Sequence, residues 1–330
     1  MGPNDRILVT GGCGSVGSAV VQTLLSTHAD VTVSALDHNE RALFNMQQRF
    51  RPQSDRLEFV LADIRDRERL EQVLRGVDIV IHTAALKHVP LSETNPFEAI
   101  ETNTVGTRNI IHAAEKAGVE RVLNVSTDKA AQPTSVMGAT KMLSERLVTA
   151  ADDESDGTRY ASVRLGNVLG TSGSVVRIFE RQIENGGPVT VTHPEMTRFM
   201  IPVSEASSFI VEAADRMSGG EVLIPKMDAM RIMDLADAMI ERSAPVDIDP
   251  ADIDIEIIGV RPGERLHERL LTTPESRNAV ELEESFVVSP RTDVRESLIS
   301  DGGRELTAPY RSDEADHLSL EEIDSLLAKV

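Results

Sequence analysis

The stretch that decides the fold reads R-I-L-V-T-G-G-C-G-S-V-G, from Arg6 to Gly17. Its apolar first part, residues 6–10, predicts a buried strand, and the pattern at 18–26 predicts a helix. Small residues between the two let the backbone approach a pyrophosphate, and the free N–H groups of the helix terminus face that pyrophosphate. The stretch therefore predicts a dinucleotide-binding turn. The residues that we expect to bind there are Gly11, Gly14, Ser15, Val16 and Gly17.

Further apolar runs alternate with helical patterns along the chain. These runs are residues 30–36, 57–61, 77–81, 121–125, 159–164 and 221–225. Strands that alternate with helices indicate an α/β fold with a doubly wound, parallel sheet of the Rossmann type. We expect residues 1–168 and about 203–226 to form the NAD-binding domain. Residues 169–202 and 227–330 should form a smaller mixed α/β lobe, with a helix at 266–271.

The second predicted strand ends at Asp37, twenty residues after Gly17. That is the expected place for a carboxylate that binds the adenosine ribose. A carboxylate there would repel a 2′-phosphate, so Asp37 favours NAD. Arg41 follows closely and could receive that phosphate, which leaves NADP as the alternative.

Three residues after later strands complete the expected cofactor site. Asp63 and Ile64 follow the third strand, where such folds place the adenine. Ala84 follows the fourth strand, under the expected path of the dinucleotide.

The charge of the chain excludes some classes of partner. It has 54 acidic and 34 basic residues among its 330, for a net charge of −20. Such a surface disfavours nucleic acid and anionic membranes as partners. We interpret the acidity as a solvation strategy, suited to a salty cytoplasm in which screening weakens the self-repulsion.

Other features of the composition fit a cytoplasmic protein. Cys13 is the one cysteine, so no disulfide framework is expected, and a reduced compartment fits. No apolar run approaches the roughly 18 residues of a membrane span. His82 and His88 have no further ligand at metal spacing, so we expect structural histidines and no metal.

A second stretch, Ser126 to Lys141, reads S-T-D-K-A-A-Q-P-T-S-V-M-G-A-T-K. Its residues Thr127, Asp128 and Lys129 follow the fifth strand, at the edge where open α/β sheets bind ligands. An acid and an amine stand side by side there, and Lys141 follows one helical turn after Met137. The chain has only six lysines, and lysine, unlike arginine, can become a neutral base. Taken alone, the stretch is equally compatible with a surface loop that carries an ordinary ion pair.

With these residues in hand, the chain resembles the extended short-chain dehydrogenase/reductases, and more closely the nucleotide-sugar 4,6-dehydratases of polysaccharide biosynthesis. The resemblance runs from about residue 6 to residue 327. The matching motifs are T-G-G-x-G-S-V-G (10–17), A-A-L-K-H-V-P (84–90), S-T-D-K-A (126–130), M-G-A-T-K (137–141), R-L-G-N-V-L-G (164–170), G-G-P-V-T-V-T-H-P-E-M-T-R-F (186–199) and R-P-G-E (261–264).

The resemblance implies a substrate and the residues that hold it. The family acts on UDP-N-acetylglucosamine or close relatives, so the smaller lobe should bind a UDP-N-acetylhexosamine. Arginine forks suit its phosphates, and a glutamate can accept from its ribose hydroxyls. We also expect a homo-oligomer, because apolar positions on the helix predicted at 95–116 suit a dimer interface. The expected substrate-binding residues are Lys87, Asn167, Arg198, Arg261 and Glu264.

The implied reaction removes water from the sugar without net redox change. NAD takes a hydride from C4, a base removes the C5 proton, the C6 hydroxyl leaves as water, and the hydride returns to C6. Lys129 is the expected base, as a neutral amine whose pKa is lowered by its surroundings. Asp128 is the expected acid, and Lys141 should bind the nicotinamide ribose and place positive charge near the C4 oxygen.

Met137 departs from the wider superfamily, which has a tyrosine here as the acid/base for the C4 hydroxyl. Active relatives also carry this methionine, so the C4 proton goes either to Asp128 or through Thr127 and water. Relatives with the methionine tend to retain the C5 configuration, which we expect here too. A UDP-sugar 4-epimerase, which needs no C5 base, and a non-catalytic dinucleotide-binding protein are the alternative functions.

Overall fold

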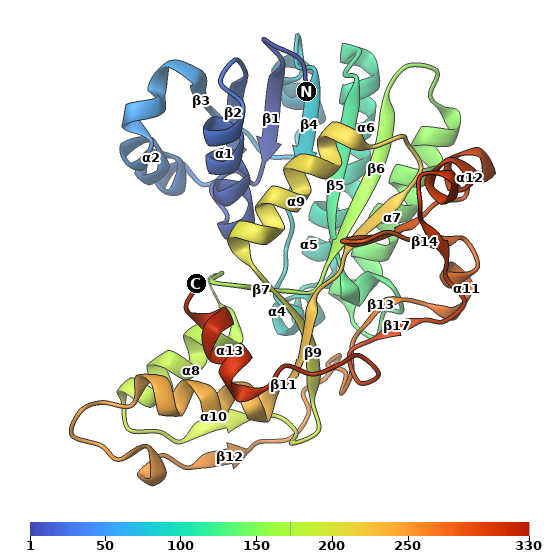
Figure 1. The fold of residues 1–330 in the computed structure, drawn as a ribbon. Coiled ribbons are helices and arrows are strands. Elements are labelled where there is room, and N and C mark those ends of the chain that lie inside the picture. The colour runs from blue at the N-terminus through green and yellow to red at the C-terminus, as the bar shows by residue number, and fades with distance from the viewer. Residues whose placement is uncertain (172, 330) are drawn as a thin grey trace.

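The computed structural model describes residues 1–171 and 173–329 of the chain. Positions 172 and 330, both in the predicted smaller lobe, lie outside the described residues. Within those ranges, the central sheet has ten strands in the order β16-β14-β15-β10-β6-β5-β4-β1-β2-β3 (Figure 1). Its strands are β1 (Arg6–Thr10), β2 (Thr32–Asp37), β3 (Leu57–Leu61), β4 (Ile79–His82), β5 (Arg121–Thr127), β6 (Arg159–Leu165), β10 (Val222–Pro225), β14 (Ala279–Glu281), β15 (Ser285–Val288) and β16 (Arg304–Glu305).

The strands from β3 to β10 in this order run parallel, and helices cover both faces of the sheet. On β1, Ile7 and Val9 point into a core shared with one helical layer, whereas Leu8 points into the core of the other. Burial on both faces explains why these strands read as continuous apolar runs. The predicted doubly wound sheet is therefore confirmed. The covering helices are α1 (Ser15–Thr27) and α9 (Val203–Arg216) on one face, and α3 (Arg67–Val73), α6 (Gly106–Ala117) and α7 (Val136–Glu154) on the other.

Shorter helices connect these layers. The helix predicted at 95–116 is present, but its middle winds more widely, as a π-helix over Ile100–Val105. No helix in the described part of the chain is both long and apolar enough to cross a membrane. The connecting elements are α2 (Glu40–Arg49), η1 (Arg51–Arg56), α4 (Val89–Thr94), α5 (Pro96–Ala99), η2 (Ile100–Val105) and η3 (Asp128–Ala130).

A smaller lobe lies beyond the carboxyl edge of the main sheet (Figure 1). Its helices enclose a core of their own around Phe179, Leu235 and Ile323. The last helix begins with a capping box formed by Ser319 and Glu322, as its S-x-x-E pattern predicts. The elements of the lobe are β7 (Asn167–Leu169), α8 (Val175–Glu184), β8 (Val189–Val191), β9 (Thr197–Pro202), β11 (Asp228–Arg231), α10 (Ile232–Ser243), η4 (Pro250–Asp252), β12 (Ile255–Ile257) and α13 (Leu320–Leu327).

The C-terminal third differs from the sequence prediction in two places. The helix predicted at 266–271 is wrong: β13 (Arg269–Leu271) pairs there with β17 (Tyr310–Arg311), a partner that local periodicity does not reveal. The strands β14 to β16 also lie within 227–330, yet they extend the main sheet, because β15 pairs antiparallel with β10. The division at residue 227 stays a prediction, and the main sheet crosses it. Two short helices, α11 (Thr273–Ser276) and α12 (Thr292–Ser300), flank these strands.

A buried charge network joins the C-terminal segment to the main sheet. The guanidinium of Arg164 on β6 lies 2.7 Å from the Glu145 carboxylate on α7 and 2.8 Å from that of Glu275 on α11. It also donates to the carbonyl of Leu270, at 2.8 Å. Arg164 is only 2% exposed, so its charge depends on these partners.

Replacing Glu275 by glutamine tests this network, because the side chain keeps its shape and loses its charge. We expect Glu275→Gln to lower the free energy of unfolding by about 1.5–3 kcal/mol, as for hydrogen bonds to charged groups. Urea denaturation followed by circular dichroism measures the change. The matched control, Glu281→Gln, removes an exposed ion pair with Lys226 and should cost less than about 1 kcal/mol. Equal losses in the two variants would contradict a special contribution from the buried network.

Candidate active site

Four parallel strands bring their carboxyl ends to one edge of the sheet. The register pairs Thr10 with His82, His82 with Asn124, and Thr127 with Leu165. Because β1 lies between β2 and β4, the chain crosses to opposite sides from this point, where open α/β sheets bind ligands. A cavity of about 450 Å³ opens there.

The glycine turn forms one wall of this first cavity. Gly11 has a positive φ of 65°, and a Cβ there would lie 2.7 Å from the Ala84 Cα atom. At Gly17, a Cβ would lie 2.2 Å from the Gly11 carbonyl oxygen. This tight packing brings the start of α1 to the cavity, so the turn fits a pyrophosphate. The predicted cofactor residues that line the cavity are Gly11, Gly14, Ser15, Val16, Gly17, Asp37, Asp63, Ile64 and Ala84.

Two carboxylates line the other end of the cavity. Asp37 accepts from the backbone N–H groups of Cys13, at 3.2 Å, and Asn39, at 3.0 Å. These bonds hold its carboxylate at the wall of the cavity. The guanidinium of Arg65 bonds the Asp63 carboxylate and holds the pKa of that carboxyl below its usual range. Arg41 is exposed on α2 and does not line this cavity, so the structure offers its predicted phosphate contact no support.

A second cavity of about 350 Å³ continues from the first, with which it shares Val16, Thr83 and Lys87. It receives residues from the loop after β5, from α7 and from the turn after β6. The sequence separates these segments, and the parallel register brings them together. The predicted site residues that line it are Lys87, Thr127, Lys129, Met137, Lys141 and Asn167.

Asp128 is completely buried beside Thr127 and Lys129 and does not itself line this cavity. Its Oδ1 atom accepts from the Thr127 hydroxyl at 2.8 Å and from the Lys129 amine at 2.9 Å. The Lys129 amine also lies 3.4 Å from the Asn167 side-chain oxygen. Burial alone would lower the pKa of Lys129, but the carboxylates of Asp128 and Glu268 outweigh it and raise that pKa. The expectation of a lowered Lys129 pKa is therefore wrong, and the resting side chain is an ammonium ion.

The amine with a lowered pKa belongs to Lys141. Its side chain is 6% exposed, and its Nζ atom donates to the Val125 carbonyl at 2.6 Å. Burial lowers the pKa of Lys141 to about 8, against a smaller opposing effect of Glu145, one turn further along α7. Met137 lies on the same helix face, lines the cavity and offers no exchangeable proton.

Two of the expected substrate ligands, Arg198 and Glu264, bind other parts of the protein. Arg198 on β9 is 5% exposed, and its guanidinium donates to the carbonyls of Thr197, Arg265 and Leu266 at 2.8–3.1 Å. Glu264 accepts from the backbone N–H of Arg261, whose side chain is exposed. Arg198, Arg261 and Glu264 do not line the second cavity, so their contact with a diphosphate stays a prediction.

The two histidines have different surroundings. His82 is buried, and its ring nitrogens lie 2.6 Å from the Thr10 hydroxyl and 3.2 Å from the Thr107 hydroxyl. Burial lowers the pKa of His82 to about 3, which confirms a neutral, structural histidine. His88 is exposed and lines both cavities. In the described part of the chain, no three His, Cys, Asp or Glu side chains form a group that could hold a metal.

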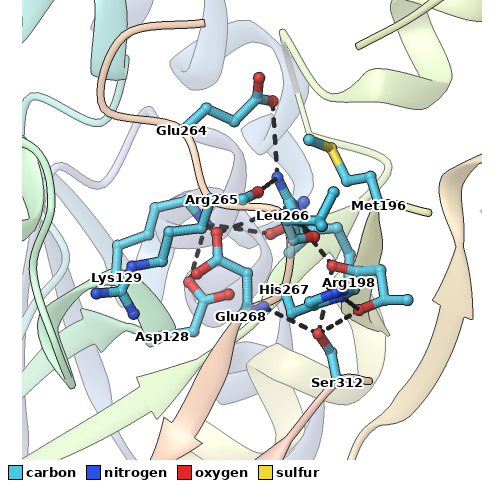
Figure 2. Close-up of polar contacts among 12 residues, drawn as sticks. Asp128, Lys129, Met196, Arg198, Glu264, Arg265, Leu266, His267, Glu268 and Ser312 are labelled. Carbon is cyan, nitrogen blue, oxygen red and sulfur yellow. Dashed lines mark hydrogen bonds and ion pairs between the residues drawn. The ribbon is translucent and has the colours of Figure 1, made fainter. Parts of the chain in front are cut away.

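Sequence reasoning missed Glu268, which lies beside the loop that carries Asp128 and Lys129. Its carboxylate is 2% exposed and comes within 3.3 Å of the Lys129 amine (Figure 2). The signal was present in L-H-E-R-L-L, residues 266–271, where the glutamate stands two positions before the buried Leu270. The helix predicted at 266–271 concealed this signal, because a helix there does not indicate which residue Glu268 would contact.

A family model described as polysaccharide biosynthesis protein matches residues 7–290. The chain belongs to this family. It is 44% identical over 330 residues to an uncharacterized membrane protein of Methanocaldococcus jannaschii, covering 99% of this chain and 96% of the relative. It is also 39% identical over 288 residues to a Campylobacter jejuni UDP-N-acetylglucosamine 4,6-dehydratase (inverting), covering 86% of this chain and 83% of that enzyme.

Solved structures of the same architecture support this membership. Pen from Bacillus thuringiensis is 35% identical, with a TM-score of 0.91, over 99% of this chain and 98% of that one. A dTDP-glucose 4,6-dehydratase from Streptomyces venezuelae, solved with NAD and TYD bound, is 26% identical, with a TM-score of 0.70. That match covers 79% of this chain and 86% of the solved one.

A Gly17→Ala variant tests the pyrophosphate cradle. The new Cβ must displace the Gly11 carbonyl, so the affinity for NAD should fall by about tenfold or more, equivalent to about 1.4 kcal/mol. Isothermal titration calorimetry measures the affinity. Gly157→Ala is the control, because a Cβ there would meet no described atom within 4 Å. An unchanged affinity in Gly17→Ala would contradict the assignment.

The lowered pKa of Lys141 predicts a dependence of stability on pH. The unfolded chain keeps this proton up to about pH 10.5, whereas the folded protein loses it near pH 8. Between these values the unfolded chain binds more protons, so the free energy of unfolding should rise with pH, by about 3 kcal/mol over the window. Lys141→Met should lack this rise, and Lys226→Met should keep it. Chemical denaturation from pH 8 to 10.5 makes the comparison, and parallel curves for Lys141→Met and the unaltered protein would contradict it.

Proposed function

We propose that the protein is a UDP-N-acetylglucosamine 4,6-dehydratase that produces a UDP-4-keto-6-deoxy-N-acetylhexosamine for polysaccharide or glycan biosynthesis. The observation that carries the proposal is the hydrogen-bonded pair of Lys129 and Asp128 at a cavity continuous with the glycine-turn cavity. A 4-epimerase has no use for an acid and an amine at C5 and C6. The family and the Campylobacter relative, which is named as an inverting UDP-N-acetylglucosamine 4,6-dehydratase, support the same substrate class.

NAD is the cofactor that fits the first cavity. The glycine turn and the start of α1 would hold its pyrophosphate, Asp37 its adenosine ribose, and Lys141 its nicotinamide ribose. When bound, NAD supplies a hydride acceptor at C4 of the sugar and a hydride donor at C6. The Streptomyces structure that contains NAD supports this choice over NADP, as does the carboxylate of Asp37.

The protein's own residues move the protons. The Asp128 carboxylate takes the proton of the C4 hydroxyl, directly or through Thr127 and water, because Met137 offers no acid/base group. The Lys129 amine, once neutral, removes the C5 proton, which the 4-ketone has made acidic. Asp128 then protonates the departing C6 hydroxyl. Lys141 places positive charge near the C4 oxygen where negative charge develops.

The decisive experiment follows UDP-N-acetylglucosamine and NAD with the protein in deuterated water by NMR. We expect a 4-keto-6-deoxy product that carries deuterium at C5 with the original configuration retained. Inversion at C5 would overturn the stereochemical part of the proposal, and a C4 epimer without this product would overturn the dehydratase. If no nucleotide sugar reacts, the non-catalytic alternative stands.

A variant assigns the chemistry to the catalytic loop. Lys129→Ala should lower kcat by about 10²–10⁴, the usual contribution of a general acid/base. Lys329→Ala is the control. It removes an exposed ion pair with Glu205, neither residue lines a cavity of the site, and kcat should stay unchanged. Equal turnover by Lys129→Ala and the unaltered protein would contradict the mechanism.

A homo-oligomer and a cytoplasmic location stay predictions, which size-exclusion chromatography and cell fractionation test.

A further inference from the structure

Glu268 presents a buried carboxylate to the catalytic amine. Its Oε1 atom lies 3.3 Å from the Lys129 amine and 3.8 Å from the Arg198 guanidinium (Figure 2). Among the described residues, Oε2 has no hydrogen-bond partner, and the same holds for Oδ2 of Asp128. Each of these two carboxylates therefore keeps one oxygen open as a buried hydrogen-bond acceptor.

The main chain fixes this carboxylate in place. The backbone N–H of Glu268 donates to the Ser312 hydroxyl at 2.9 Å, and its carbonyl accepts from the Ser312 N–H at 3.0 Å. Arg198 binds the carbonyls of Arg265 and Leu266 on one side, and Arg164 binds that of Leu270 on the other. The distance from Glu268 to Lys129 therefore depends on the fold and not on a flexible surface side chain.

The proposed reaction needs two proton acceptors near the loop at the same time. Met137 leaves the C4 hydroxyl proton to Asp128, directly or through Thr127 and water. The resting Lys129 is an ammonium ion, so it must lose a proton before it can act as a base. Asp128 already holds the proton from C4, and Glu268 is the second carboxylate in contact with the amine.

We propose that Glu268 holds the ammonium proton of Lys129 during the elimination, so that Lys129 can act as the C5 base. The inference rests on the proposed dehydratase function. Glu268 does not line the substrate cavity, so it acts through Lys129 as a positioning residue for the proton.

The protons balance through one turnover. The C4 hydroxyl proton passes to Asp128 as the hydride leaves C4, and a Lys129 proton passes to Glu268. The neutral amine takes the C5 proton, while Asp128 gives its proton to the C6 hydroxyl, which departs as water. After the hydride returns to C6, Lys129 protonates C5. Glu268 then returns its proton to Lys129, and the resting charges are restored.

Other charged groups near the pair keep their charge in this scheme. Arg198 on β9 and Arg265 on the loop before β13 face the carboxylates of Asp128 and Glu268. Arg269 lies near Arg265, and Glu264 lies 3.6 Å from the Arg198 guanidinium. Arginine does not titrate in the working range, so the three arginines supply a constant field. Proton exchange is left to Asp128, Lys129 and Glu268.

The test compares the pH dependence of kcat for Glu268→Gln and the unaltered enzyme on UDP-N-acetylglucosamine, from pH 7 to 9. Without Glu268, Lys129 must release its proton to solvent, so the variant should lose about 10² in kcat at pH 7. The ratio of the variant's kcat to that of the unaltered enzyme should then rise about tenfold per pH unit, while KM stays within about twofold. Glu281→Gln, which removes an equal charge from an exposed pair, should give a ratio near one throughout.

Each outcome bears on the inference. A Glu268→Gln activity that is reduced by the same factor at every pH would show a merely structural role and overturn it. If Glu268→Gln does not fold, Glu268→Asp replaces it: this variant keeps a carboxylate, so its ratio should stay constant with pH, and a rising ratio would overturn the inference. If the unaltered protein forms no 4-keto-6-deoxy product, the proposed function fails first, and this inference falls with it.

Discussion

Parallel hydrogen bonding among β1, β4, β5 and β6 is the constraint on which the site depends. The register places the ends of these strands at one edge, although they are separated by up to 155 residues of chain, from Thr10 to Leu165. At this edge, β1 leads into the glycine turn and β4 ends at the buried His82. β5 leads into the loop that carries Asp128 and Lys129, and β6 leads into the turn that carries Asn167. A slip of one residue in β5 would turn Asp128 and Lys129 to the opposite face and separate them from the dinucleotide cavity.

The protonation of the two lysines in the site depends on which groups compensate their buried charges. Lys129 keeps its proton because two carboxylates outweigh its desolvation, whereas Lys141, with a backbone carbonyl as its partner, has a lowered pKa. Two lysines 12 residues apart thus have opposite protonation tendencies within one pocket. The carboxylates of Asp128 and Glu268 thus favour the charged form of Lys129, which burial alone would disfavour.

The sequence predicted what local patterns encode. The glycine turn, the strands and the T-D-K loop were readable because each is a continuous segment with its own signal. Glu268 was not, because its contact with Lys129 joins residues 139 positions apart, through a strand that pairs with residues 310–311. The direction of the Lys129 pKa shift failed for the same reason, since it depends on that second carboxylate. Arg198 matched a motif, but a motif does not tell whether a guanidinium faces a ligand or the protein's own carbonyls.

The use that Arg198 makes of its donors changes how substitutions there should be interpreted. The guanidinium groups of Arg198 and Arg164 donate to backbone carbonyls on either side of Glu268. Losing the Arg198 hydrogen bonds would displace the Glu268 carboxylate. A loss of activity on substitution of Arg198 would therefore not by itself identify a substrate ligand, because the same change also releases the backbone that carries Glu268.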